Sequence, residues 1–162
     1  MKCVVQRVRC ARVVVDGAVV GEVGKGMLVL VCAMRGDTEK EATALAQKVA
    51  QFRFFADDAG KMNRSALDTS AGVLVVSQFT LAADGSAGRR PSFDKAALPD
   101  LARVLVERFV AELSGLGLVV QTGRFGAHME VELVNDGPVT FALESAPKPP
   151  VGASGDPSQV LA

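Results

Sequence analysis

The chain of 162 residues carries 18 basic and 18 acidic side chains, so its formal net charge is zero. That balance excludes a nucleic-acid-binding protein held by an extensive basic surface, but it allows contact with one end of an RNA. A hydrophobic content of 49% in a chain of this length is typical of a single globular domain with a substantial core.

The cysteines and the apolar runs indicate a cytoplasmic protein. Cys3, Cys10 and Cys32 are an odd number without a C-x-x-C spacing, which fits a reducing compartment better than a disulfide framework. No apolar run approaches the roughly 20 residues that a membrane span needs, and the first residues do not resemble a secretory signal. We expect no contact with a membrane.

His128 is the single histidine of the chain. A histidine-rich metal site is therefore excluded, and any Ser-His-Asp or Cys-His mechanism would depend on this one residue. Its position between Ala127 and Met129, at the approach to a strand, favours an ordinary surface histidine. We expect neither a metal nor another cofactor.

The first part of the chain has the patterns of β-strands. Residues 3–8 and 12–16 are strand-like, and Asp16 and Gly17 between two apolar runs predict a hairpin with a type I′ turn. Residues 27–33 form a continuous apolar run, which predicts a central strand.

A helix and two strands are expected next. Thr38 and Glu41 have the spacing of a capping box, which predicts the beginning of an amphipathic helix over residues 39–51. Residues 52–56 are consistent with a short strand. The run of β-branched residues within positions 73–80 predicts a buried strand.

A second helix is predicted to begin near Pro99 and to end at Gly115 and Gly117. The residues of this helix that we expect to face the core are Leu101, Leu105, Phe109 and Leu113. The remaining predicted strands cover residues 118–122, 130–135 and 139–143.

This order of elements predicts a mixed α/β domain with a largely antiparallel sheet, curled towards a barrel, and two main helices. The domain is expected to cover residues 1–144. Residues 145–162 are rich in proline and small residues and have no hydrophobic periodicity, which predicts a disordered C-terminal tail.

Polar and aromatic groups gather where the strand over residues 73–80 ends. The residues in question are Ser77, Gln78, Phe79 and Thr80. After the turn over residues 84–88, Arg89 and Arg90 add two cations. A rigid strand that delivers hydroxyl, amide and backbone N–H groups to a rim beside cations is typical of sites for anionic esters. Without other motifs, a core strand that ends in a polar turn would be the favoured explanation of these residues.

The last two predicted strands are separated by a turn over residues 135–140, which contains Gly137 and Pro138. Only about 5–6% of X–Pro bonds in folded proteins are cis, so the local sequence alone favours a trans bond here.

Taken together, four separated motifs closely resemble the D-aminoacyl-tRNA deacylases. They are SQFTL at residues 77–81, RPSF at 90–93, TGRF at 122–125 and NDGPVT at 135–140. Residues 6–8 and 60–63 match that family as well, and the resemblance covers roughly residues 1–144 in the same order.

The resemblance implies a homodimer with the deacylase fold, which removes D-amino acids from the 3′ end of tRNA at a site shared across the subunit interface. One subunit would supply the strand end from Ser77 to Thr80. The partner would insert Gly137 and Pro138, joined by a cis bond, with backbone carbonyls that face the α-carbon of the substrate. Val139 and Thr140 would complete the same substrate-binding turn.

Steric exclusion would explain how such an enzyme selects D-amino acids without a fitted side-chain pocket. Rigid backbone at Gly137 and Pro138 would block the direction in which an L side chain projects and leave a D side chain free. Glycine has no side chain to reject, so we expect hydrolysis of glycyl-tRNA as well.

For the chemistry, the backbone N–H groups of Phe79 and Thr80 would form an oxyanion hole. Two roles are open for the Thr80 hydroxyl. As a nucleophile it would need a neighbouring base, and His128 is the only histidine. The shortage of bases favours the other role, in which Thr80 orients substrate or water and the 2′-hydroxyl of the terminal ribose assists.

Five further residues are candidates for contact with the RNA or the turn. Phe125 and Met129 would pack near the terminal adenine, although a place in the core is equally consistent with their types. Arg90, with Arg89 less constrained, would meet phosphates of the acceptor end. Arg7 would brace the Gly-Pro turn by hydrogen bonding or stand as an ordinary surface arginine.

Two other functions remain open from the sequence. A threonine- or serine-nucleophile esterase would be trapped covalently at Ser77 or Thr80. A non-catalytic module that binds the tRNA end would bind aminoacyl-tRNA without turnover.

Overall fold

The computed structural model describes residues 1–145 of the chain. Apart from Ser145, the tail predicted over residues 145–162 lies outside the described residues.

One mixed sheet organises the described residues, with its strands in the order β2–β1–β3–β6–β7. The first half of β1 pairs with β3 and its second half with β2, and β8 pairs with β1 along the opposite edge. The bounds of these strands are β1 Lys2–Val15, β2 Ala18–Val23, β3 Gly26–Cys32, β6 Gly72–Ser77, β7 Val120–Thr122 and β8 Glu130–Glu144. β1 is antiparallel to β2, β3 and β8, whereas β6 is parallel to β3 and to β7. The predicted mixed α/β class is confirmed.

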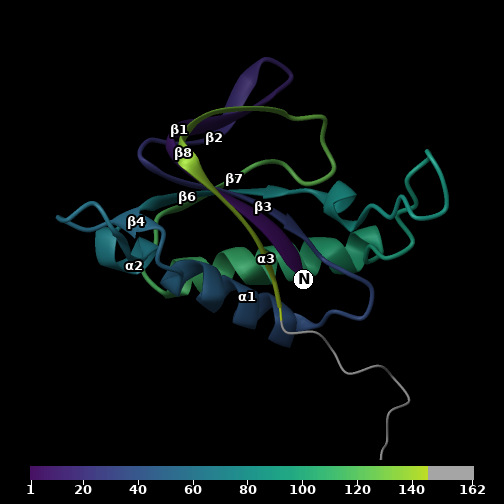
Figure 1. Ribbon diagram of the computed structural model, residues 1–162. Coiled ribbons are helices and arrows are strands. Elements are labelled where there is room, and N and C mark those ends of the chain that lie inside the picture. The colour runs from purple at the N-terminus through teal and green to yellow at the C-terminus, as the bar shows by residue number, and fades with distance from the viewer. Residues whose placement is uncertain (146–162) are drawn as a thin grey trace, which may run out of the picture.

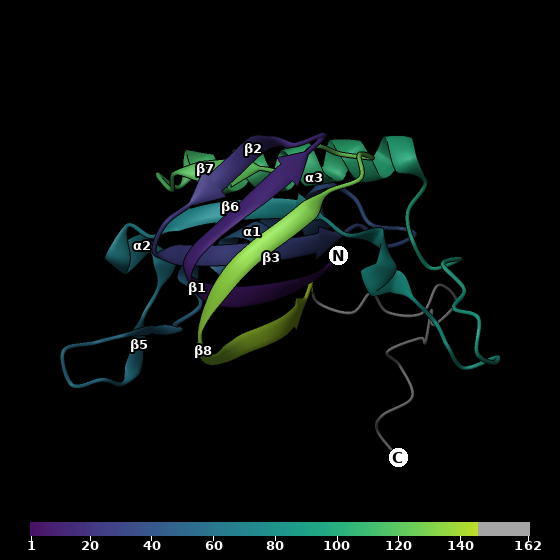
Figure 2. The ribbon, with the colours of Figure 1, turned by 90° about the horizontal axis from the view of Figure 1, so that it is seen from above.

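Two long helices cover one face of this sheet (Figure 1). They are α1 Glu39–Gln51 and α3 Pro99–Gly115, and the shorter elements are β4 Phe55–Ala56, β5 Met62–Arg64, α2 Ala66–Thr69 and the 3₁₀ helix η1 Phe79–Ala82. Figure 2 shows β2 and β8 running obliquely across β3 and β6, on the side away from the helices. The sheet is therefore strongly curled.

The curl brings β2 close to β7, so that the sheet nearly closes. A Cβ atom at Gly21 in β2 would collide with the carbonyl oxygen of Thr122 in β7 and lie 3.2 Å from Leu74. Glycine is required at this point because only its missing side chain allows the two backbones to approach. One core cluster lies between the sheet and the helices and includes Leu45 and Phe109. A second, smaller cluster is enclosed by the curled strands and includes Val8, Val13 and Leu74.

The local signals at the predicted hairpin and first helix are confirmed. Asp16 and Gly17 have φ values of 51° and 77°, as a type I′ turn requires. The Thr38 N–H donates to Glu41 Oε2 at 2.8 Å, which closes the capping box of α1. Leu45 and Val49 of that helix are fully buried.

The prediction for the face of α3 was wrong at one residue. Leu105, Phe109 and Leu113 are buried, but Leu101 is 43% exposed. In the first turns of the helix, Ala102 and not Leu101 packs against the core.

Several predicted boundaries were also wrong. Residues 3–8 and 12–15 belong to one strand, β1, because β8 pairs with it from Lys2 to Val14 with two irregularities, and Asp16 lies in the turn to β2. β8 is likewise one strand where two were expected, and the Gly-Pro turn is an irregularity in its pairing with β1. The strand predicted over residues 73–80 ends at Ser77, and the chain then forms η1.

Candidate functional site

A pocket of about 650 Å³ opens at the carboxyl ends of β3 and β6. Its walls are the end of β6, the first turns of α3 and the loop that precedes β8, and the lining is largely apolar. The lining residues that matter below are Ser77, Gln78, Phe79, Phe93, Phe125 and Met129. A concave, mostly apolar cavity with a few polar groups at a strand end is a common form of ligand site.

Backbone geometry at the strand end leaves two donors free. The Gln78 N–H donates to the Val31 carbonyl at 2.8 Å, which extends the pairing with β3 one residue past the end of β6. η1 follows, and within residues 1–145 the N–H groups of Phe79 and Thr80 have no acceptor. The first N–H groups of a helical turn have no partner within it, so both donors are available to a bound oxyanion.

The side chains at this strand end are also placed. Gln78 Nε2 donates to the hydroxyl oxygen of Thr80 at 2.6 Å. The Phe79 ring is 60% exposed and meets the Phe93 ring edge to face, with 5.1 Å between centroids. Thr80 itself lies just outside the pocket wall, whereas Ser77 is part of it.

Cys32 lies buried beside the same strand end. Its sulfur lies within hydrogen-bonding distance of two carbonyl oxygens, that of Ala33 at 3.4 Å and that of Phe79 at 3.6 Å. Burial, and secondarily the charge of Asp37, raises the pKa of this thiol above its ordinary value. Cys32 is therefore a neutral support for the strand end and not a thiolate nucleophile.

The loop before β8 closes one side of the pocket. Phe125 and Met129 are both partly buried and line the cavity. Neither is therefore a fully buried core residue, and both are placed to contact a ligand in the pocket. The guanidinium of Arg103 in α3 stands over the Phe125 ring, 4.6 Å from its centroid. His128 is exposed, as expected, but it too borders the pocket.

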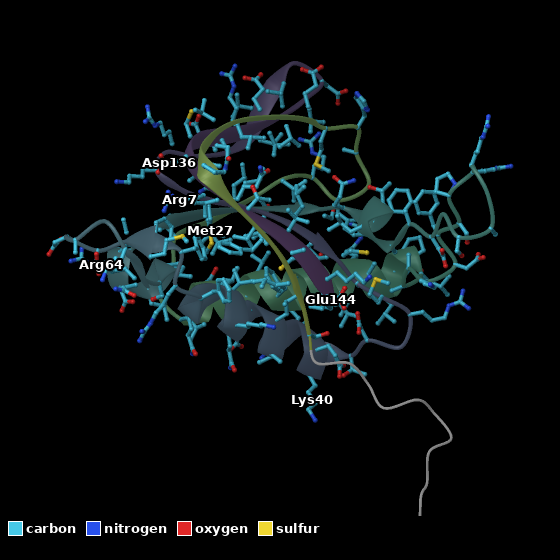
Figure 3. The ribbon with its side chains drawn as sticks, in the orientation of Figure 1. Arg7, Met27, Lys40, Arg64, Asp136 and Glu144 are labelled. Atoms are coloured by element: carbon cyan, nitrogen blue, oxygen red, sulfur yellow. The ribbon has the colours of Figure 1, made fainter. Side chains whose placement is uncertain are left out.

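The second candidate element is the turn in β8. The bond between Gly137 and Pro138 is cis, and both residues are exposed. Arg7 Nε donates to the Asp136 carbonyl at 2.9 Å and lies 3.2 Å from its carboxylate, while Nη1 donates to the Phe54 carbonyl at 2.8 Å (Figure 3). Arg7 therefore braces the residue directly before the turn.

Asn135 ties the turn from the other side. Its amide nitrogen donates to the carbonyl oxygens of Arg7 at 2.9 Å and Val139 at 3.2 Å. A Cβ atom at Gly137 would collide with the Asn135 side-chain oxygen and lie 2.6 Å from the Val139 nitrogen. Any residue other than glycine would thus displace the turn.

Within one chain the pocket and the turn lie far apart. Ser77 pairs with Val31 in β3, which pairs with Cys3 in β1, whereas Thr140 beside the turn pairs with Gln6 in β1. The path between them crosses from β6 over β3 and β1 to β8. At roughly 3.3 Å per residue and 4.8 Å per strand, the two elements are on the order of 15 Å apart.

Arg89 and Arg90 lie on neither element. Both are exposed in a loop that projects from the molecule beyond η1 (Figure 1). Asp84 and Ser92 close the base of this loop through two backbone hydrogen bonds of 2.8 and 2.9 Å. A hydrogen bond from Lys95 holds the pKa of the Asp84 carboxyl well below its usual range.

The structure thus joins part of the predicted site. It brings Ser77, Gln78 and Phe79 together around one pocket with Phe125 and Met129. Gly137 and Pro138, with Arg7 beside them, lie away from this pocket. Arg89 and Arg90 lie at a third place, in the exposed loop after η1. Sequence reasoning missed four residues: Cys32, Phe93, Arg103 and Asn135. Phe93 and Asn135 stand inside recognisable motifs, whereas Cys32 and Arg103 reach the site only through tertiary folding.

Two further properties concern the described residues as a whole. In residues 1–145 no group of three or more His, Cys, Asp or Glu side chains could hold a metal ion. None of the helices there is long and apolar enough to cross a membrane.

Known proteins resemble this chain over almost all of its described length. The sequence profile of a family described as D-Tyr-tRNA(Tyr) deacylase matches residues 4–144. The D-aminoacyl-tRNA deacylase of Ruegeria sp. (strain TM1040) is 61% identical over 90% of this chain and 93% of its own length. That of Paracidovorax citrulli (strain AAC00-1) is 59% identical over 91% of this chain and 95% of its own length.

Solved structures agree with the fold. A structure titled "c-Myc DNA Unwinding Element Binding Protein" is 38% identical, with a TM-score of 0.84 over 90% of this chain and 99% of that one. A structure of a probable eukaryotic D-amino acid tRNA deacylase has a TM-score of 0.76 over 88% of this chain and 98% of that one, and its identity of 16% bears on the fold alone. On the family match and the close relatives, this chain belongs to the D-Tyr-tRNA deacylase family, the hydrolases whose curated members carry the name D-aminoacyl-tRNA deacylase.

Proposed function

We propose that this protein hydrolyses the ester bond between a D-amino acid and the 3′ end of tRNA, and that it does so in the cytoplasm as a homodimer. The observation that carries the proposal is the combination of two features: a strand-end pocket with two free backbone donors at its edge, and a separate, exposed Gly-Pro turn braced by Arg7. The close relatives named for this activity supply the substrate class.

The chemistry needs little from side chains because an aminoacyl ester is already activated. Water adds to the ester carbonyl carbon, and the N–H groups of Phe79 and Thr80 stabilise the negative charge on the carbonyl oxygen. The bond to the ribose oxygen then breaks, and the proton lost by water ends on that ribose oxygen. The neighbouring 2′-hydroxyl assists this transfer.

Thr80 serves as a positioning group in this scheme. Its hydroxyl accepts a hydrogen bond from the Gln78 amide, which cannot act as a base. This contact favours orientation of substrate or water over nucleophilic attack, and it disfavours the esterase with a covalent threonine intermediate. The terminal adenine would stack in the apolar part of the pocket near Phe125 and Met129, while Arg90 would meet a phosphate of the acceptor end.

A second subunit explains how the turn takes part. The separation of roughly 15 Å within one chain keeps Gly137 and Pro138 away from the pocket of their own chain. Both residues are exposed and Arg7 fixes the turn, so it can enter the pocket of a partner subunit as a rigid wedge. Its backbone, together with Val139 and Thr140, would then block the space that an L side chain needs.

The test is hydrolysis of matched D-Tyr-tRNA, L-Tyr-tRNA and Gly-tRNA by the purified protein. We expect rapid loss of the D ester, sparing of the L ester and hydrolysis of the glycyl ester, which presents no side chain to the wedge. Binding of D-Tyr-tRNA without turnover would instead support a non-catalytic module. Equal cleavage of the D and L esters would leave an esterase without a stereochemical filter.

A further inference from the structure

A second pocket, of about 430 Å³, lies directly beside the Gly-Pro turn. Its charged lining residues are Arg7, Lys25, Arg64 and Asp136, which makes three cations against one carboxylate. Thr69 and Ser70, at the end of α2, add two hydroxyl groups to the same wall. A chain whose net charge is zero therefore concentrates positive charge at this place.

Part of this charge is neutralised inside the protein. Arg7 and Asp136 pair with each other at 3.2 Å, and this pair holds the chain directly before the Gly-Pro turn. Lys25 is exposed, and its ammonium group has no hydrogen bond or ion pair within residues 1–145. Arg64 pairs at 3.0 Å with Asp58, whose side chain is 93% exposed, so water screens that pair strongly. Arg64 also lies within electrostatic reach of the Asp57 and Asp68 carboxylates. Lys25 is thus the cation wholly available to a ligand, and Arg64 is a second cation that the ligand would share with these surface carboxylates.

We propose that Lys25 and Arg64 form a phosphate-binding subsite for the backbone of tRNA whose 3′ end occupies the pocket of the partner subunit. This inference rests on the proposed function. The pocket belongs to the same chain as the turn and borders it through Arg7 and Asp136. If the turn enters the partner's site, the cationic pocket is carried to the mouth of that site.

The chemistry of the lining fits a phosphodiester. A lysine ammonium acts as a point charge for phosphate, and an arginine guanidinium offers a fork of donors. The Thr69 hydroxyl already donates to the Ser65 carbonyl at 3.0 Å, so Ser70 is the hydroxyl side chain of this wall that can donate to a phosphate oxygen. No base-reading group is needed, because phosphate contacts position an RNA without specifying its sequence.

The experiment compares two substrates that share the reacting ester, D-Tyr-tRNA and D-tyrosyl adenosine, which lacks the RNA backbone. The variant is Lys25→Gln with Arg64→Gln. The control, Lys40→Gln with Lys48→Gln, removes the same charge from α1, where Lys40 lies away from Arg7 and Arg64 (Figure 3). We expect kcat/KM on tRNA to fall about five- to thirtyfold in the variant at low salt, and the slope of log kcat/KM against log salt to flatten by about one to two. The ratio of the two substrates should move only in this variant.

Three results with the two substrates would overturn the inference. An equal loss on both substrates would mean that Lys25 and Arg64 act on the turn and not on RNA. No loss on either, or the same loss in the control, would mean that their charge is merely solvated. Affinity for uncharged tRNA is measured alongside, so that the subsite is tested independently of the proposed function. If the native protein cleaves no D ester, the proposed function fails. A weaker affinity of the variant for tRNA would still support the subsite, and an affinity equal to that of the native protein would refute it.

Discussion

The contact between Gln78 and the Thr80 hydroxyl separates the two roles that the sequence left open for Thr80. A nucleophile would need a base at that distance, and the structure places an amide there. We therefore expect Thr80→Ala to keep most of its activity and to lose less than about tenfold in kcat on D-Tyr-tRNA, well short of the loss that follows removal of a nucleophile. Single-turnover hydrolysis checks this, and a variant that folds and binds but does no chemistry would show that Thr80 is the nucleophile.

The three cysteines should differ sharply in reactivity. Burial raises the pKa of the Cys3 thiol to about 12 and also raises that of Cys32, whereas Cys10 is exposed. We expect iodoacetamide at pH 8 to modify Cys10 alone in the folded protein, as mass spectrometry of peptides would show. Rapid modification of Cys32 would contradict its assigned role as a buried support.

The same pKa values have a consequence for stability. Below pH 9.0, the ordinary pKa of a cysteine, the Cys3 thiol is protonated in the folded and in the unfolded chain, and the protein keeps its full stability. Above that value only the unfolded chain ionises, so the free energy of unfolding should fall as the pH rises beyond about 9. Replacing Cys3 with alanine should weaken this dependence.

At the scale of elements, the turn in β8 depends on glycine for a steric reason. Because a Cβ at Gly137 would collide with the Asn135 side chain and crowd the Val139 nitrogen, Gly137→Ala must displace the turn. We expect the ratio of D-Tyr-tRNA to L-Tyr-tRNA hydrolysis to fall by at least about tenfold in this variant. Gly115→Ala, at a position where an added Cβ meets nothing within 4 Å, is the matched control. Unchanged selectivity in Gly137→Ala would remove the turn from the filter.

Elements with a strong local signal could be predicted from the sequence. Thr38 and Glu41 fix the beginning of α1 through their own side chains, and Asp16 and Gly17 suit the positive φ values of their turn. Such features depend on neighbours along the chain. The continuity of β1 and β8 depends instead on pairing between distant segments, which no local pattern reveals.

The site divides in the same way. Ser77, Gln78 and Phe79 could be selected because they follow a predicted buried strand within a recognisable motif. The support of Phe79 by Cys32, and of Phe125 by Arg103, arises only when β3 and α3 are packed against the pocket. The exposure of Leu101 could not be foreseen either, because Leu101 and Ala102 both fit the helical period and the pattern does not tell which of the two meets the core.

At the scale of the whole molecule, the central claim is that one site is assembled from two chains. The curled sheet holds the pocket and the turn at separate places, and the turn is exposed and braced by hydrogen bonds from Arg7 and Asn135. Isologous dimers join such elements in reciprocal pairs, so that a homodimer would contain two equivalent sites.

Complementation between subunits tests this claim most directly. One variant, Ser77→Phe, fills the pocket, and the other, Gly137→Ala with Pro138→Ala, disables the turn; each is first shown to be folded and dimeric. If the site is shared, refolding an equal mixture of the two should restore D-Tyr-tRNA hydrolysis to about a quarter of the native rate, because half of the dimers gain one intact site. Activity no greater than the sum of the two separate variants would show that each chain builds its site alone, and would contradict the account.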